Sequence, residues 1–144
     1  MADIRHSISI DAPIDRVFPL IASGSGFTRW WAADVTEDHS TGIIEVAFFN
    51  RATVYHLKPI PSSASWTTEW LCQTGQEWTG TRLLFEPTET NGKTQLRFTH
   101  ADWKAETEYF RSCTKVWGEL MFRLKAAAEG TGLGPRFSKD GLAS

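Results

Sequence analysis

Cysteine is scarce in this sequence of 144 residues, which contains only Cys72 and Cys113. The two thiols lie far apart and match no metal-ligand spacing, so we expect neither a disulfide framework nor a zinc site. Residues 1–5 lack the basic start and the apolar stretch of an export signal. We therefore expect two buried thiols in a reducing compartment and a cytoplasmic protein.

An excess of charge of one sign and long apolar runs are also missing. The formal net charge is -2, whereas nucleic-acid binders need a clustered excess of Lys and Arg. No apolar run approaches the roughly 20 residues that span a bilayer. The sequence shows no metal-ligand spacing of His and acidic residues, no phosphate-binding glycine loop and no nucleophile elbow. We therefore expect no nucleic acid, membrane, metal or cofactor as a partner, and we assign no catalytic residue.

Aromatic residues are what the sequence has in excess, with seven Trp and nine Phe beside two Tyr. The chain is long enough for one domain with a hydrophobic core. Aromatic side chains in these numbers build either a large core or an apolar pocket, and composition alone does not choose between them.

Alternation of apolar and polar residues predicts short strands over residues 4–10 and from residue 35 to residue 100. Short turns such as Asn91-Gly92 separate them, which favours antiparallel pairing of neighbours. One further strand is expected over residues 53–57. The residues that share one face of a predicted strand are Ile4, His6, Ile8 and Ile10; Ile44, Val46 and Phe48; Trp66, Thr68 and Trp70; Thr81, Leu83 and Phe85; and Leu96, Phe98 and His100.

Apolar residues at spacings of three and four predict a helix of about 20 residues from Phe110 to Ala127, ended by Gly130. Two short helices are expected after the first strand, the first of them kinked or shortened by Pro19. One long helix and one sheet must bury their apolar faces on each other, which gives an α+β fold. We expect a single domain over residues 1–130 and a flexible C-terminal tail over residues 131–144.

Several short motifs, taken in order, resemble the START-like (SRPBCC) superfamily. They are Ile-Ser-Ile-Asp-Ala-Pro at 8–13, Val17-Phe18 and Arg-Trp-Trp at 29–31. Residues 94–100, Trp117-Gly118, Leu124-Lys125 and residues 129–132 are similar to the branch of that superfamily named after activators of a heat-shock chaperone ATPase. The resemblance spans nearly the whole chain. It implies the helix-grip fold, in which a curved antiparallel sheet wraps around a long C-terminal helix and encloses an apolar cavity.

The resemblance also implies a function: binding of a small apolar or aromatic ligand, lipid-like or polyketide-like, between the sheet and the helix. One alternative is a cyclase- or dehydratase-type enzyme that uses a cavity histidine. Another is a co-chaperone-like module of the stress response that stimulates a chaperone ATPase. The oligomeric state stays open, although Trp30 and Trp78, if exposed, would form a self-association patch.

Eleven residues are candidates for lining the cavity: Tyr55, Trp66, Thr68, Trp70, Thr81, Leu83, Phe85, Phe98, His100, Cys113 and Trp117. The aromatic members either contact a ligand or fill the core beneath the long helix. Cys113 is either a wall residue or an inert core residue. Trp31 with Trp30 forms either a gate at the cavity mouth or a plug of which one ring is half exposed.

His100 and His6 face inward on two strands that are neighbours in the family fold. An inward histidine orients a ligand carbonyl or transfers protons near neutral pH. The alternative is a core histidine whose hydrogen bonds are satisfied by the protein itself.

Overall fold

The computed structural model of the protein describes residues 2–141, over which the chain forms a seven-stranded sheet in the order β1-β7-β6-β5-β4-β3-β2. Neighbouring strands pair antiparallel throughout, as the short turns predicted. The strands are β1 Ala2–Ile10, β2 Asp34–Glu37, β3 Ile44–Phe48, β4 Thr53–Ile60, β5 Thr68–Cys72, β6 Arg82–Thr90 and β7 Lys93–Trp103.

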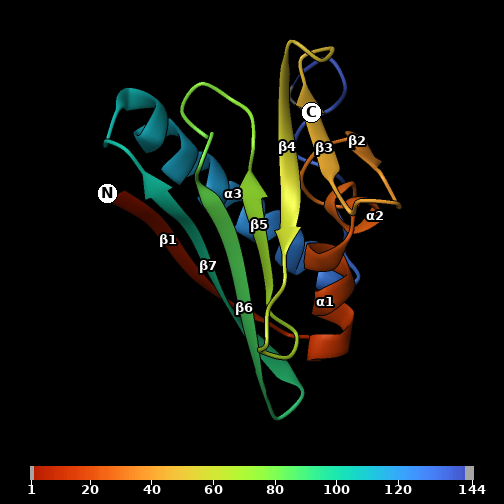
Figure 1. The fold of residues 1–144 in the computed structure, drawn as a ribbon. Helices are drawn as coiled ribbons and strands as arrows, with labels where there is room; N and C mark the ends of the chain where they lie inside the picture. The colour runs from red at the N-terminus through yellow and green to blue at the C-terminus, as the bar shows by residue number, and fades with distance from the viewer. Residues whose placement is uncertain (1, 142–144) are drawn as a thin grey trace.

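Helices cover one face of this sheet. Two short ones, α1 (Ile14–Ala22) and α2 (Gly24–Phe27), follow β1, and the long helix α3 (Glu108–Glu129) follows β7. Figure 1 shows the strands in front of α3, with α1 and α2 at the side of the sheet that carries β2 to β4. This is the predicted α+β helix-grip arrangement, a curved sheet around a long C-terminal helix.

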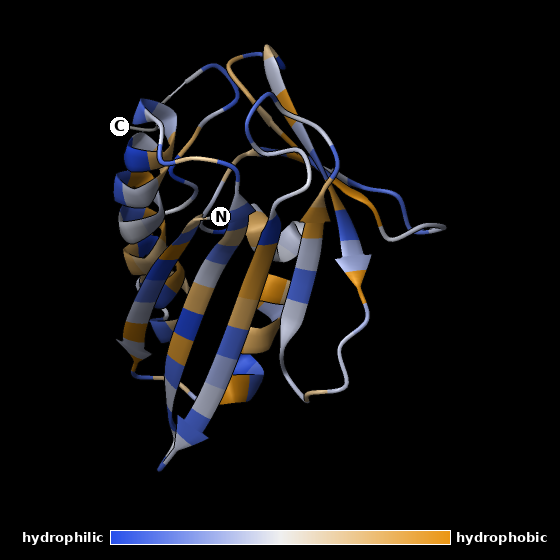
Figure 2. Ribbon diagram, turned by 60° about the vertical axis from the view of Figure 1, so that its left-hand side comes forward, coloured by the Kyte–Doolittle hydropathy of each residue, from blue (hydrophilic) through white to orange (hydrophobic). Residues whose placement is uncertain are grey.

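The sequence patterns explain why these elements form. In β1, Ile4 and Ile10 are buried while Arg5 is exposed, and the resulting alternation of hydrophobic and hydrophilic residues is visible along the strands in Figure 2. Helix α3 buries a stripe at helical spacing, as predicted. The side chain of Thr107 accepts a hydrogen bond from the backbone N–H of Phe110 at its start, and Gly130 ends the helix in a left-handed conformation with φ 87°.

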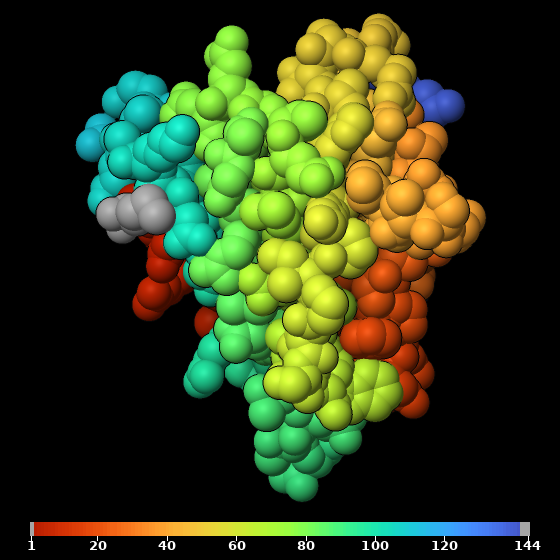
Figure 3. All heavy atoms as spheres, viewed as in Figure 1, coloured from red at the N-terminus to blue at the C-terminus, as the bar shows by residue number. Residues whose placement is uncertain are grey.

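The other face of the sheet is polar. Arg82 on β6 donates to Glu69 and Asp102, at 2.6 and 2.7 Å, so the strands carry ion pairs where they meet water. Figure 3 views the molecule from this side, and the β6–β7 hairpin protrudes at its lower end. The hydrophobic core and any ligand cavity therefore lie on the helix side of the sheet.

Pro19 was expected to kink or shorten helix α1, and the helix continues through it to Ala22, so the shortening does not occur. A second local expectation was wrong. Strand β5 begins at Thr68, and Trp66 precedes it with a positive φ of 67° and a 42% exposed side chain. Such a backbone breaks the alternation, because a residue with this φ cannot continue a strand. Trp66 therefore does not share the inward face with Trp70.

The segment that we expected to be a flexible tail packs against the domain over residues 131–141. The backbone of Phe137 bonds to Trp31 and Ala33 in a short parallel bridge. Arg136 pairs with Glu119 of α3, and the backbone N–H of Asn50 donates to Lys139 at 2.7 Å. Residues 142–144 of the predicted tail lie outside the described residues. The segment thus adds a wall to the domain beside α3 and the β3–β4 hairpin.

Candidate functional site

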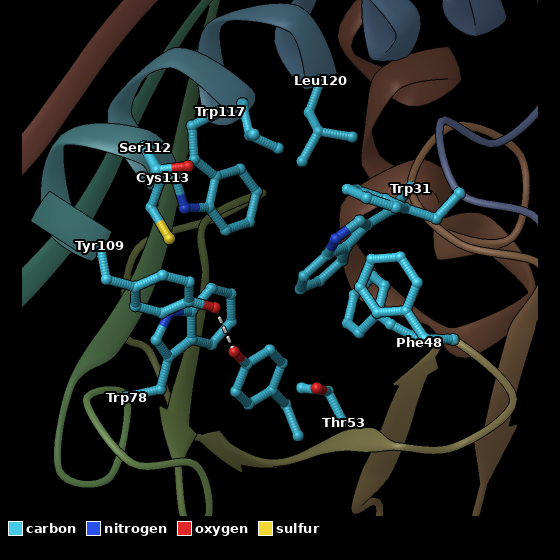
Figure 4. A pocket seen from close by; sticks show the side chains of 13 residues that line it. Trp31, Phe48, Thr53, Trp78, Tyr109, Ser112, Cys113, Trp117 and Leu120 are labelled. Atoms are coloured by element: carbon cyan, nitrogen blue, oxygen red, sulfur yellow. Dashed lines mark hydrogen bonds between the residues drawn. The ribbon is translucent and has the colours of Figure 1, made fainter. Parts of the chain in front are cut away.

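A cavity of about 280 Å3 lies between the β3–β4 hairpin and α3. Further walls come from Trp31 in the segment after α2, from Trp78 in the β5–β6 loop and from Phe137 in the C-terminal segment. Figure 4 shows the side chains around the empty centre. The lining residues are Trp31, Phe48, Phe49, Thr53, Tyr55, Trp78, Tyr109, Ser112, Cys113, Val116, Trp117, Leu120 and Phe137. All of them are uncharged, so the cavity is an aromatic and mostly apolar space.

A stacked pair of rings forms one wall. The rings of Tyr55 on β4 and Trp78 in the β5–β6 loop have centroids 3.9 Å apart and an interplanar angle of 10°. Gly75 makes this close packing possible, because a Cβ atom at this position would come within 2.6 Å of the Tyr55 ring. Its φ of +108° also favours glycine. The loop is thereby folded down over Tyr55, and Trp78 is buried.

The cavity has a closed end and an open end. At the closed end, Trp31 and Trp117 lie 5.1 Å apart, and both rings are almost fully buried together with Leu120. Tyr109, at the start of α3, is 40% exposed and marks the open end. Phe49, beside Phe137, is a second exposed lining residue. A ligand that enters past Tyr109 would reach the two buried indoles last.

Two tyrosine hydroxyls meet at the open end. The oxygens of Tyr55 and Tyr109 lie 2.5 Å apart, and Figure 4 shows this bond crossing one side of the cavity. Burial raises the pKa of Tyr55 to about 12, and burial also raises the pKa of Tyr109. Both phenols are therefore neutral at physiological pH and act as hydrogen-bonding groups instead of charges.

Cys113 lines the cavity on the first turns of α3 and is mostly buried. Its pKa is raised, chiefly by burial. A thiol kept protonated in this way is a weak nucleophile. Cys113 is thus a wall residue, and the geometry gives it no catalytic role.

His100 lies outside the cavity lining and is completely buried behind it. The indole N–H of Trp117 donates to His100 Nδ1 at 3.1 Å, which places the proton of the neutral imidazole on Nε2. Nε2 then donates to Thr81 Oγ1 at 2.8 Å, and Thr81 donates to the carbonyl oxygen of Trp78 at 2.6 Å. Every polar atom in this chain of hydrogen bonds has a partner.

This network makes His100 a structural residue that holds two cavity walls, Trp117 and Trp78. Burial lowers the pKa of His100 to about 3, so the ring is neutral across the physiological range. His6 occupies the neighbouring strand as expected, but its ring bonds to the backbone carbonyl of Thr114 on α3 at 2.9 Å. The two histidines therefore serve as core residues with separate partners, which was the alternative to a catalytic pair.

Of the predicted site residues, the structure brings Tyr55, Cys113 and Trp117 together around the cavity. The others lie elsewhere. Thr68 and Trp70 both donate to the carbonyl oxygen of Ile21 at the end of α1, and Trp66 is at the surface. The remaining predicted residues form buried core or its hydrogen-bond network: Thr81, Leu83, Phe85, Phe98 and His100.

Several lining residues were missed or placed wrongly by sequence reasoning. Trp78 lines the cavity, and the patch considered for Trp78 and Trp30 does not form, because they are 4% and 0% exposed. Trp31 lines the cavity at its closed end and not at its mouth, and neither Trp31 nor Trp30 is half exposed. Phe137 lies in a stretch rich in glycine and polar residues that carries no periodicity. The only sign in the sequence that Phe137 is packed against the domain is that it is an aromatic residue in such a stretch.

Other kinds of site find no support among residues 2–141. No group of three or more His, Cys, Asp or Glu side chains in this part of the chain could hold a metal ion. The helices that the structure describes include none with the length and apolar character needed to cross a membrane.

Comparison with solved structures identifies the fold class. The chain shares its fold with solved structures that include an Aha1 protein and a START superfamily protein, which confirms the helix-grip fold that the sequence motifs implied. An Aha1 dimer from Colwellia psychrerythraea aligns with a TM-score of 0.77 and 23% identity, over 91% of this chain and 98% of that one. A START superfamily protein from Mycobacterium smegmatis aligns with a TM-score of 0.62 and 13% identity, over 89% and 94%.

Protein MLL2253 from Mesorhizobium loti aligns with a TM-score of 0.76 and 12% identity, over 92% of this chain and 100% of that one. No protein-family model and no curated protein sequence matches the chain. At these identities the comparisons establish a shared fold, and the function has to be argued from the cavity.

Proposed function

We propose that this protein binds one small, largely apolar aromatic ligand in the cavity between the β3–β4 hairpin and α3. The observation that carries the proposal is an uncharged, aromatic-walled space of about 280 Å3 that opens to solvent at one end. Enclosed apolar spaces with a few polar groups are the usual form of small-molecule sites. Removal of the ligand's apolar surface from water would supply the affinity, at about 25 cal/mol per Å2.

The size of the cavity narrows the ligand class that the family resemblance implied. Ligand pockets usually enclose about 300–1,000 Å3, so this cavity of about 280 Å3 lies just below that range. One or two fused rings fit such a space better than a long-chain lipid or a large polyketide.

A neutral fluorescent probe, N-phenyl-1-naphthylamine, tests this proposal. Val116 lines the cavity from α3, and Val116→Phe would fill the space with a ring. We expect the wild type to bind one probe per chain and the variant to bind at least tenfold more weakly. The matched control is Lys115→Phe, which adds the same ring at an exposed position one residue earlier on the helix. Equal probe binding by Val116→Phe and the wild type, with both folded, would overturn the proposal.

A second candidate function is that of a co-chaperone-like module that binds a heat-shock chaperone and stimulates its ATPase. The observation that favours it is the similarity to an Aha1 protein across 91% of this chain. A titration of the purified chaperone with this protein, with ATP hydrolysis as the readout, tests it. A dose-dependent rise in hydrolysis supports this function, and a flat response with no co-sedimentation rejects it.

The enzyme alternative is not proposed again, because it required a cavity histidine. The cavity described above is lined by no histidine, and His100 has both ring nitrogens occupied. For the cellular location we retain the cytoplasm as a proposal, supported by the two free, buried thiols of Cys72 and Cys113.

A further inference from the structure

Two tyrosine hydroxyls meet at one place in the cavity wall. Most of the wall is ring and aliphatic carbon, with Trp31, Phe48 and Leu120 among the main surfaces. The hydroxyl oxygens of Tyr55 and Tyr109 lie 2.5 Å apart, and the dashed line in Figure 4 marks the bond between them. A ligand that fits this wall has an apolar ring system and one oxygen function at its edge.

The two tyrosine hydroxyls leave hydrogen-bonding capacity unused. One proton lies between the oxygens of Tyr55 and Tyr109, which are 2.5 Å apart. Whichever hydroxyl donates that proton, the other hydroxyl keeps its own, and both oxygens retain acceptor lone pairs. The pair can therefore donate one hydrogen bond to a ligand oxygen and accept one from a ligand O–H.

The charges around the cavity disfavour an anion. Burial and, more weakly, the negative charge of Glu77 raise the pKa values of Tyr55 and Cys113. The lining, as described for residues 2–141, contains no cation, and two arginines close to it in sequence are already paired. Arg51 bonds to Asp34 and Glu45. Arg136, in the C-terminal segment, bonds to Glu119. A carboxylate in this cavity would lose its water without gaining a cation, which is strongly unfavourable.

We propose, on the basis of the proposed function, that the cavity selects neutral phenols, with the aromatic rings against Trp31 and Trp117 and the phenolic oxygen at the Tyr55–Tyr109 hydroxyl pair. Selection comes from the unused donor and acceptor of this pair. A hydrocarbon of the same shape would leave them without a partner when it displaced water from the open end.

Three probes of similar shape separate the effects of the ligand's rings, hydroxyl group and negative charge: naphthalene, 2-naphthol and 2-naphthoate. Each is titrated into the protein at pH 7, with tryptophan fluorescence as the readout. We expect 2-naphthol to bind about 5- to 10-fold more tightly than naphthalene, the ratio that one net hydrogen bond supplies. We expect 2-naphthoate to bind at least tenfold more weakly than 2-naphthol.

Tyr55→Phe combined with Tyr109→Phe removes both hydroxyls and keeps both rings, which is needed because either hydroxyl alone could still donate to and accept from the ligand. In this variant the affinities for 2-naphthol and naphthalene should lie within about twofold of each other, with that for naphthalene unchanged. Thr88→Val, which removes a hydroxyl from an exposed position on β6, is the matched control and should keep the wild-type ratio.

The outcomes distinguish this inference from the proposed function beneath it. Equal binding of 2-naphthol and naphthalene by the wild type, lost for both in Val116→Phe, would leave the cavity as a binding site and overturn the selection of phenols. Tightest binding of 2-naphthoate would overturn it as well. Binding of none of the three probes, together with no binding of N-phenyl-1-naphthylamine, would reject the proposed function itself.

Discussion

Two aromatic regions lie on the helix side of the same sheet, and they differ in how their rings are held. The first, which we call the closed region, lies around Phe27 and is distinct from the closed end of the cavity. In it the Phe27 ring packs edge-on against the rings of Trp30 and Trp70, with 5.9 and 5.6 Å between ring centroids. There the indole N–H groups of Trp30 and Trp70 donate to the carbonyl oxygens of Leu20 and Ile21. In the cavity region, Trp78 stacks on Tyr55, and no residue among 2–141 accepts a hydrogen bond from its indole N–H.

This difference indicates that the secondary-structure element packed over the aromatic residues determines whether they form a closed core or a cavity. Helix α1 ends against the closed region, and its last carbonyls fix two indoles in place. The cavity region is covered by the first turns of α3 and by an irregular segment around Phe137. There the indole N–H of Trp117 is held by His100 but that of Trp78 has no such anchor among the described residues, and the large flat rings leave a space between them.

The largest expected effect is a loss of stability in the closed region. Phe85 is fully buried, so Phe85→Ala should lower the free energy of unfolding by about 3–5 kcal/mol. The corresponding change at the cavity wall, Phe48→Ala, should cost only about 1–2 kcal/mol, because the ring already lacks packing partners on one side. Urea denaturation followed by far-UV circular dichroism measures both. Equal losses would mean that the two regions are equally well packed.

How far the sequence predicts this molecule follows from the same comparison. The strands and the long helix could be predicted because alternation and helical spacing are local properties, and the fold class followed from them. The site could be predicted only in part, at Tyr55, Cys113 and Trp117, because its rings meet from segments far apart in the chain. Trp78 in a polar turn and Phe137 in a glycine-rich stretch carry no local sign of burial. The alternation of inward and outward residues also gave a wrong prediction for Trp66, because strand β5 starts two residues later, at Thr68.

A second effect concerns pH and the hydrogen bonds by which His100 holds two cavity walls, Trp117 and Trp78. Its native pKa of about 3 lies below the ordinary value of about 6.5. The unfolded chain therefore takes up a proton below about pH 6.5 while the native chain does not. Above pH 6.5 the free energy of unfolding keeps the full contribution of the neutral His100. Acidification lowers the free energy of unfolding by about 2 kcal/mol between pH 6.5 and pH 4.5.

The measurement is the difference in pH dependence between the wild type and His100→Gln, which lacks the titrating ring. Other groups titrate equally in both proteins and cancel. We expect the variant to be less stable at pH 7, because Trp117 and Thr81 lose a partner. Its stability should also fall less steeply below pH 6.5. Parallel curves for the two proteins would show that His100 is not held neutral by the fold.

The smallest expected change in stability lies at the wall that the sequence patterns missed. Phe137 packs edge-on against Phe48, with 5.0 Å between the ring centroids, and it is only partly buried. Phe137→Ala should cost about 1 kcal/mol of stability, since the segment keeps its backbone bonds to Trp31 and Ala33. Binding of N-phenyl-1-naphthylamine should nevertheless weaken about 3- to 10-fold, because about 1 kcal/mol of apolar contact with the probe is lost.

The matched control is Phe122→Ala, which removes a 66% exposed ring from α3 and should change neither quantity measurably. The informative quantity is the ratio of the two effects of Phe137→Ala. A ring that belongs to the closed core would lower stability by several kcal/mol, with probe binding falling only as the protein unfolds. A ring that belongs to the cavity wall weakens binding in a protein that stays folded. Unchanged binding in folded Phe137→Ala would remove the C-terminal segment from the site and leave the walls formed by α3, the β3–β4 hairpin, Trp31 and Trp78.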